Sequence, residues 1–294
     1  MGAVLVTGAT GNVGVEVAGQ LLRRTVNVKA AVRRASTSHV AEGAIPVDFD
    51  FQDEGTFDAA LHGVDRVFLM RPPDMSDAKA FRPFIHAMER SGVNQVTFLS
   101  VQGAGKNVFV PHHAIEVQLK RSSLSWTLLR PSFFMQNLAT THLSEIRDRD
   151  EIYVPAGKGR TNFIDVADIG EVAAVCLTAT GHERKAYEIT GTEALTYAEV
   201  AQVLTAALGR KITYRNPSAR AFKARMKAAG HDDDFVKVMA RIYAIAKIGM
   251  AAGTTDTFEK LVGHRPRTMA EWAATSAACW QRASQADHPP EQLR

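Results

Sequence analysis

Short apolar, β-branched runs alternate with amphipathic segments through the first half of the chain. Apolar residues at three- and four-residue spacing predict helices near 13–23, 55–62, 77–91 and 112–123. The apolar runs between them predict the strands Ala3–Thr7, Val26–Val32, Ile45–Val47, Arg66–Met70, Gln95–Ser100 and Trp126–Leu129. Strands that alternate with helices are typical of βαβ units, so we predict an α/β fold with a doubly wound parallel sheet.

The hydrophobic pattern changes after Pro131. A loop-rich stretch follows, and from Thr196 onward the pattern is mainly helical. The later elements that we predict are a strand running into a helix over 162–180, a strand over Ala186–Thr190 and a short strand near Lys211–Arg215. We expect a smaller, mainly helical C-terminal domain, with the active site at the carboxyl ends of the strands, in the cleft between the two domains.

The two predicted domains are assembled from separate parts of the chain. The larger comprises 1–132 and is completed by about 160–190, and the smaller comprises 133–159 and 191–283. The tail, 284–294, is polar, and we predict that it is disordered.

Composition and charge narrow the class of protein. The net charge of the 294 residues is +4, and the basic residues are scattered rather than gathered in a stripe, so no nucleic-acid partner is expected. No apolar run approaches the roughly 20 residues of a membrane-spanning helix, and the N-terminus does not resemble a signal peptide. Cys176 and Cys279 lie far apart, which gives neither a disulfide framework nor a cysteine metal site. We predict a cytoplasmic protein, monomeric or homodimeric, that acts on a small molecule.

Three glycines mark a nucleotide site. Gly8, Gly11 and Gly14 directly follow the first predicted strand and open the first predicted helix. Dinucleotide-binding domains need a tight turn there, with backbone close to the pyrophosphate and the N–H groups of a helix N-terminus pointing at it. The spacing in this context predicts a Rossmann-type nucleotide-binding domain.

Two arginines indicate which dinucleotide binds. Arg33 stands 19 residues after Gly14, at the end of the second predicted strand, and Arg34 follows it. NAD-specific domains carry an acidic residue near this position for the ribose hydroxyls, whereas a guanidinium pairs with a 2′-phosphate. The sequence therefore favours NADP(H) over NAD(H).

The motifs resemble those of one known family. The chain is similar, from Ala3 to about Trp280, to the NmrA-like branch of atypical short-chain dehydrogenases/reductases, which includes type 2 NAD(P)H:quinone oxidoreductases, triphenylmethane reductases, short-chain-type azoreductases and the NADP-sensing regulator NmrA. The stretches that carry the resemblance are 6–14, 68–73, 97–100, 112–116, 127–137, 187–191 and 261–268.

The resemblance implies contacts to the adenine half of the dinucleotide. It places Arg33 at the 2′-phosphate, and Asp50 with Phe51 near the adenine, although Phe49 replaces the glycine usual before that pair. The loop residues that it implies around the pyrophosphate are Gly8, Thr10, Gly11, Asn12 and Val13.

The resemblance also implies contacts to the nicotinamide half. These residues follow three later predicted strands. They are Met70, Arg71 and Pro72 on the ribose and pyrophosphate side, Ser100 and Val101 beside the nicotinamide ribose, and Pro131, Ser132 and Phe133 around the nicotinamide ring.

One departure from ordinary short-chain dehydrogenases bears on the reaction. Their Tyr-x-x-x-Lys pair is replaced here by His112-x-x-x-Glu116, and no tyrosine occurs between residues 1 and 152. Alcohol–ketone chemistry through a phenolate is therefore not expected. His112 or His113 is a candidate proton donor; alternatively, His112 caps the helix or hydrogen-bonds the cofactor ribose. We expect Glu116 to orient its histidine neighbour.

These observations predict an NADPH-dependent reductase that transfers hydride directly to a quinone-, azo- or imine-type acceptor. The alternative is a non-catalytic NADP(H)-binding redox sensor of the NmrA type; a sugar-nucleotide epimerase fits less well, because it too needs the tyrosine. The predicted acceptor contacts are Phe134, Met135 and Asn137. The alternative is that the first two pack in the core and that Asn137 only satisfies the loop backbone. The run 231–234, a histidine and three aspartates, we interpret as a helix cap, and we predict no metal site.

Overall fold

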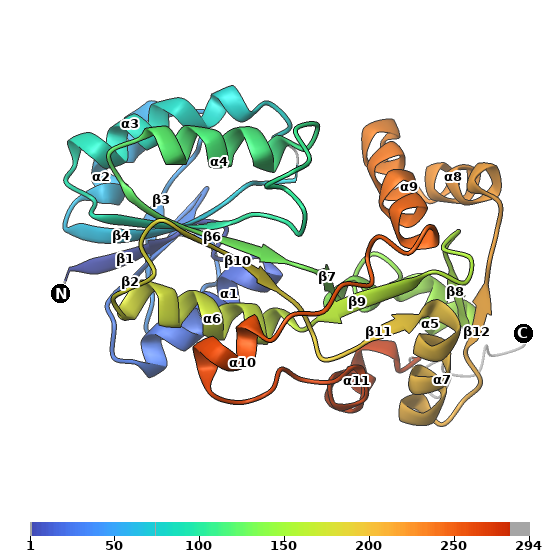
Figure 1. Cartoon of the computed structure of the whole chain (residues 1–294). Coiled ribbons are helices and arrows are strands. Elements are labelled where there is room, and N and C mark those ends of the chain that lie inside the picture. The colour runs from blue at the N-terminus through green and yellow to red at the C-terminus, as the bar shows by residue number, and fades with distance from the viewer. Residues whose placement is uncertain (1, 74, 283–294) are drawn as a thin grey trace, which may run out of the picture. The chain divides into compact units, whose positions relative to one another are not determined.

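A seven-stranded parallel sheet forms the centre of the first of two compact units in the computed structural model, which describes residues 2–73 and 75–282 (Figure 1). The strand order is β10-β6-β5-β4-β1-β2-β3. The strands are β1 (Ala3–Val6), β2 (Val28–Val32), β3 (Ile45–Asp48), β4 (Val64–Met70), β5 (Gln95–Leu99), β6 (Ser125–Pro131) and β10 (Lys185–Ile189). The predicted doubly wound parallel sheet is confirmed.

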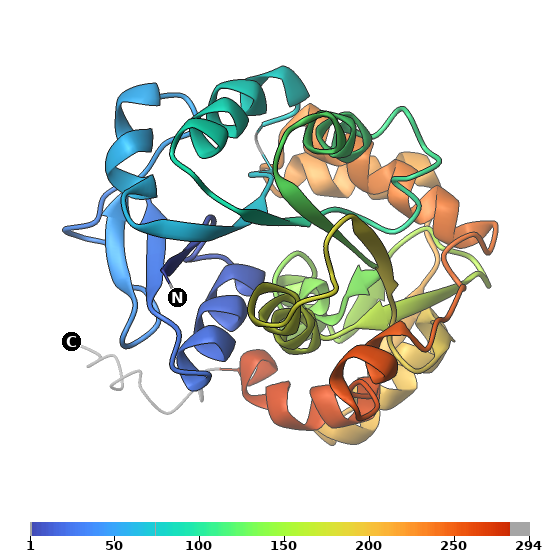
Figure 2. The ribbon, with the colours of Figure 1, turned by 60° about the vertical axis from the view of Figure 1, so that its left-hand side comes forward.

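Helices cover both faces of this sheet, because alternate strand residues point to opposite sides. Val4 and Val6 pack with α1 (Asn12–Arg23), α6 (Val166–Thr178) and α10 (Thr257–Val262). Leu5, between them, packs with α2 (Phe57–Leu61), α3 (Arg82–Arg90) and α4 (Pro111–Arg121). Figures 1 and 2 show these two helical layers on either side of the sheet.

Contacts within the chain define the two units. Unit 1 comprises 2–134, Asn162–Glu193 and Thr254–Arg267 of the described residues, and unit 2 comprises Met135–Thr161, Ala194–Gly253 and 268–282. The sequence pattern predicts that Thr254–Arg267 belongs to the smaller domain. The structure groups it with the sheet because Phe258 of α10 is fully buried in the core beside α6.

Unit 2 is mainly helical. Its helices are α5 (Leu143–Arg149), α7 (Tyr197–Leu208), α8 (Ala219–Ala228), α9 (Asp233–Lys247) and α11 (Met269–Ser276). The short strands β8 (Glu151–Tyr153) and β12 (Thr213–Arg215) pair in parallel. As predicted, the aspartate run caps a helix: the Asp232 carboxylate accepts hydrogen bonds from the Asp234 and Phe235 N–H groups at the start of α9.

The stretch after Pro131 contains more structure than its sequence predicts. It forms β7 (Phe133–Phe134), a 3₁₀ turn over Met135–Leu138, and then α5 and β8. Strand β7 pairs in parallel with β9 (Arg160–Ile164). No helix in the described part of the chain is both long and apolar enough to cross a membrane. The predicted disordered tail, 284–294, lies outside the described residues.

Candidate active site

The predicted cofactor residues come together at one edge of the parallel sheet. The glycine loop follows β1, Arg33 follows β2, Asp50 lies just beyond β3, Arg71 follows β4, and Ser100 follows β5. Since neighbouring parallel strands lie about 4.8 Å apart and end at the same edge, these residues follow one another along one rim of the sheet. Such a rim is where open α/β sheets bind their ligands.

The glycine loop leads from β1 into the N-terminus of α1. Gly11 is the N-cap residue, and it has no side chain with which to bond the first free N–H groups of the helix. The first turn carries no acidic residue, so its N–H groups and the positive end of the helix dipole suit an anion. Thr10 and Asn12 are exposed, whereas Val13 is buried and offers its backbone only.

The three glycines have different steric roles. Gly8 has φ +63°, and a Cβ there would lie 2.2 Å from the Met70 sulfur. A Cβ on Gly14 would lie 2.1 Å from the Gly8 carbonyl oxygen, so Gly14 lets α1 pack onto the turn. For Gly11, the nearest atom to a Cβ is the same oxygen at 3.3 Å. The space beside Gly11 is therefore open on its outer side, as a pyrophosphate requires, and the loop fits the predicted dinucleotide.

Arg33 and Arg34 directly follow β2, and both are exposed. The register pairs Val6 of β1 with Ala30 of β2, so both strands end beside the glycine loop. Two guanidinium groups at this place suit the 2′-phosphate of NADP(H).

An aromatic cluster explains the departure at Phe49. The Phe49 ring lies 4.8 Å from the Phe51 ring and 4.8 Å from the Phe84 ring, measured between centroids. Both Phe49 and Phe51 are buried, so the Phe51 side chain belongs to the core. The half-buried Asp50 accepts a hydrogen bond from the Gln52 N–H at 2.9 Å. Because the Phe51 side chain lies in the core, only Asp50 and the Phe51 backbone are available at the predicted adenine position.

Arg71 and His112 influence each other electrostatically. The Arg71 Nη1 donates hydrogen bonds to the carbonyl oxygens of Pro72, at 2.9 Å, and Met75, at 2.6 Å. Burial and, second, the positive charge of Arg71 lower the pKa of His112 to about 4. The imidazole is therefore neutral at pH 7 and holds no readily released proton, which weakens the case for His112 as a general acid.

Glu116 does not take the partner that its spacing suggests. Its carboxylate accepts hydrogen bonds from the Ser100 hydroxyl, at 2.6 Å, and from Arg130 Nε and Nη2, at 2.9 and 2.6 Å. Burial raises the pKa of Glu116, but the hydrogen bonds from Arg130 and Ser100 outweigh burial and leave the pKa below its usual value. Glu116 is a buried anion that holds Ser100 and Arg130, whereas we expected it to orient His112.

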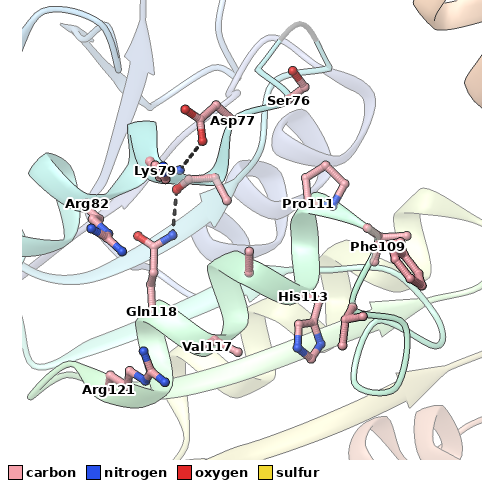
Figure 3. A pocket seen from close by; sticks show the side chains of 14 residues that line it. Ser76, Asp77, Lys79, Arg82, Phe109, Pro111, His113, Val117, Gln118 and Arg121 are labelled. Atoms are coloured by element: carbon pink, nitrogen blue, oxygen red, sulfur yellow. Dashed lines mark hydrogen bonds between the residues drawn. The ribbon is translucent and has the colours of Figure 1, made fainter.

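His113 faces a different environment from His112. One ring nitrogen, Nδ1, lies 2.8 Å from the Ala104 carbonyl oxygen, and the ring lines a cavity of about 560 Å³ (Figure 3). Pro111 and Phe109 lie near His113, while Arg82 and Arg121 line the other end. None of the predicted cofactor residues lines this cavity, so it is distinct from the rim of the sheet.

The residues after β6 are held by buried hydrogen bonds. Ser132 Oγ donates to Asn162 Oδ1 at 2.8 Å, and the Gln102 N–H donates to the Pro131 carbonyl at 2.9 Å. Phe133 is half-buried, 6.3 Å from the Phe163 ring. Asn162, for which the sequence predicts no role, is fully buried and ties β9 to the residue that follows β6.

The three predicted acceptor contacts fall in both units. Phe134 lies in unit 1, where it packs partly buried against the core. Met135 and Asn137 lie in unit 2. Met135 is only 2% exposed, and the Asn137 carbonyl accepts a hydrogen bond from the His142 N–H. Met135 therefore has the environment of a core residue.

Comparison with known proteins gives full-length matches. A family model described as NAD(P)H-binding matches residues 8–180. The chain is 35% identical over 290 residues to an NAD(P)H azoreductase of Xenophilus azovorans, covering 94% of this chain and 99% of the relative.

Two solved structures agree with the fold. An NADPH-dependent quinone oxidoreductase of Escherichia coli in complex with NADPH has a TM-score of 0.83 at 28% identity, covering 92% of this chain and 99% of the other. Triphenylmethane reductase of Citrobacter sp. with NADP(H) has a TM-score of 0.81 at 24% identity, covering 94% and 99%, and supports the fold alone. These matches confirm the predicted α/β fold and the predicted nicotinamide dinucleotide cofactor.

Proposed function

Because the chain belongs to the NAD(P)H-binding family, we propose that it transfers hydride from NADPH to a small quinone-, azo- or imine-type acceptor. That the chain is an NAD(P)H-dependent oxidoreductase follows from its full-length relatives. The relatives named azoreductase and quinone oxidoreductase support the choice of acceptor class.

The observation that carries the choice of acceptor is the Glu116 carboxylate where ordinary short-chain dehydrogenases have a lysine. Ser100 and Arg130 donate hydrogen bonds to that carboxylate, and His112, at the tyrosine position, is neutral near pH 7. This arrangement has no acidic group for a developing alkoxide. Two kinds of acceptor need no proton at the moment of hydride transfer and fit it best. Quinones and azo groups spread the incoming charge, and a protonated imine has a positive charge that the hydride neutralises.

Bound NADPH would supply the hydride, and the protein's residues would bind and orient its two ends. The α1 N-terminus would hold the pyrophosphate, and Arg33 the 2′-phosphate. Ser100, Ser132 and Phe133 would hold the nicotinamide half. Catalysis would then rest on proximity and orientation, which are worth several powers of ten in rate.

A comparison of four acceptors tests the proposal. Purified protein with NADPH is mixed with a benzoquinone, an azo dye, a cyclic imine and an aliphatic ketone, and loss of absorbance at the reduced-nicotinamide band is followed. We expect turnover with at least one of the first three and none with the ketone. A Gly11→Ala protein serves as the control for reduction that bypasses the dinucleotide site.

Two outcomes would overturn the proposal. Faster turnover of the ketone than of the other acceptors would mean that a proton donor acts in the site. If calorimetry detected NADPH binding but no acceptor oxidised the bound NADPH, the result would support the alternative of a non-catalytic redox sensor.

A further inference from the structure

We propose that Arg130 is a positioning residue that holds Ser100 and the loop over 101–110 in place at the nicotinamide end of the site. The proposal rests on the proposed function, since it assumes that Ser100 lies beside the cofactor. Arg130, Glu116 and Glu188 together form the Arg130 cluster.

The Arg130 cluster joins three elements of unit 1. Arg130, in β6, binds Glu116 of α4 through two parallel hydrogen bonds, from Nε at 2.9 Å and Nη2 at 2.6 Å. Its third nitrogen, Nη1, lies 3.4 Å from Glu188 Oε1 of β10. The Glu116 side chain is 1% exposed and that of Arg130 is 13% exposed. A planar guanidinium with both edges occupied has one orientation only.

The cluster determines which hydrogen bonds Ser100 can form. The Ser100 hydroxyl donates to Glu116 Oε1 at 2.6 Å, and Ser100 is 1% exposed. A serine hydroxyl has a single hydrogen, so Ser100 can offer only its lone pairs to another group. Ser100 is therefore suited to accept a hydrogen bond from a ribose hydroxyl and is unsuited to give a proton to an acceptor.

The same cluster anchors the loop that begins after Ser100. The Gly103 N–H donates to Glu188 Oε2 at 3.4 Å. A Cβ on Gly105 would lie 2.6 to 2.7 Å from three guanidinium atoms of Arg130, so the loop backbone packs directly on that group. Arg130 thus contacts the loop from one side and, through Glu116, holds Ser100 from the other.

Stability alone is a poor explanation for the buried Arg130–Glu116 ion pair of the cluster. Removing charges from water costs free energy that their attraction often only balances, and well-packed apolar residues in the same place are commonly as stable or more so. The cluster does fix geometry, because each hydrogen bond constrains the next. A positioning role accounts for its place directly behind Ser100.

Gly105→Ala disturbs the cluster without removing any of its charged groups. Gly105 has no left-handed backbone requirement, and the new methyl group meets the guanidinium of Arg130 and no backbone atom. The fold can therefore adjust while Arg130 or the loop shifts. Glu188→Ala removes the outer arm of the cluster and leaves the Glu116 arm. Lys106→Ala, on an exposed residue of the same loop, is the matched control.

Two readouts separate this proposal from the proposed function. The first is the fluorescence increase of NADPH on binding, which reports how tightly the nicotinamide end is held and needs no acceptor. We expect Gly105→Ala and Glu188→Ala to lose at least half of that increase, with the NADPH Kd from calorimetry within about threefold of the unaltered protein. The second is kcat with the best acceptor, which we expect to fall about tenfold or more.

Lys106→Ala should change neither readout. If the unaltered protein reduced no acceptor but the two variants lost the fluorescence increase, the proposed function would fail and the role of the Arg130 cluster would stand. If both variants matched Lys106→Ala in fluorescence and kcat, the positioning role would be overturned. A lower thermal midpoint with both readouts unchanged would also overturn it, because that result describes a purely structural cluster.

Discussion

Gly11→Ala tests whether the loop after β1 holds the pyrophosphate. The backbone at Gly11, with φ −87° and ψ 165°, is one that alanine adopts without strain. Alanine is a poorer N-cap than glycine by about 0.5 kcal/mol or more, but replacing glycine also stabilises the fold by about 0.4–1 kcal/mol through the unfolded chain. The two effects nearly cancel, so we expect the free energy of unfolding to change by less than about 1 kcal/mol.

Binding should respond much more strongly than stability. The new methyl group enters the open space beside the α1 N-terminus, where a phosphate would accept hydrogen bonds from backbone N–H groups. A hydrogen bond to a charged group is worth about 1.5–3 kcal/mol. Loss of one such bond raises the Kd for NADPH roughly 10- to 150-fold.

Gly14→Ala is the matched control, because it adds the same methyl group three residues away. There the Cβ would lie 2.1 Å from the backbone oxygen of Gly8, so α1 must move away from the turn. Such overpacking costs about 1–3 kcal/mol, which lowers Tm by several degrees, roughly 3–10 °C.

Titration calorimetry with NADPH and thermal melts of the three proteins measure both effects. Binding of NADPH by Gly11→Ala with unaltered affinity would place the phosphate elsewhere and refute the reasoning. So would a Tm of Gly11→Ala as low as that of Gly14→Ala, because it would show that the space beside Gly11 is filled.

Three further predictions use single substitutions. In calorimetry, the unaltered protein should bind NADPH at least about tenfold more tightly than NADH, which is about 1.4 kcal/mol, and Arg33→Ala should remove that preference with little change in the affinity for NADH. Equal affinities of the unaltered protein for the two dinucleotides would contradict this prediction. His112→Ala should lower kcat with a quinone less than about tenfold, because the pKa of His112, about 4, keeps it neutral; a loss of about 10²–10⁴-fold would identify a general acid. Burial lowers the pKa of His142 from 6.5 to about 4. Between pH 6.5 and pH 4 the unfolded chain therefore binds a proton that the folded protein does not, so the free energy of unfolding falls as the pH drops through this range. The free energy of unfolding from urea titrations should be about 2 kcal/mol lower at pH 5 than at pH 7.5, and His142→Gln should abolish this His142-dependent difference.

The parts of the fold that sequence predicts well are those with strong local signals. The fully buried strand Gln95–Leu99 is a short run of residues that favour β-structure, and turn residues flank it. The glycine loop was predictable for a similar reason, since the turn, the helix start and the phosphate each need glycine within seven residues, 8–14.

The stretch between Pro131 and Asn162 could not be predicted in the same way. Its strands β7 and β8 span two and three residues, which is too short for a period to be detected. Both strands exist because of distant partners: Phe133 pairs with Phe163, and Glu151 with Thr213. Tertiary pairing of this kind leaves no trace in local composition.

The role of Glu116 shows the same limit within the candidate site. Its spacing from His112 correctly puts both on one helix, but the carboxylate turns to Ser100, which follows β5, and to Arg130 in β6. One signal was present in the sequence: Arg130 directly follows the apolar pair Leu128 and Leu129, and a charge at the end of a buried strand needs a buried partner. That requirement predicts a nearby carboxylate without identifying which one.

The charge balance of the Arg130 cluster bears on the acceptor. Arg130 offsets one of the two carboxylates of Glu116 and Glu188, and Lys120, whose Nζ lies 3.6 Å from Glu116, offsets the other. The Arg130 cluster and Lys120 together therefore have no net charge. A lysine at position 116 would instead place a cation there. An alkoxide forming from a ketone needs such a cation or a proton at once, whereas a hydroquinone anion spreads its charge over its own ring. A glutamate in place of that lysine therefore withdraws electrostatic help that a ketone needs, and this is the physical reason for proposing a quinone-, azo- or imine-type acceptor instead.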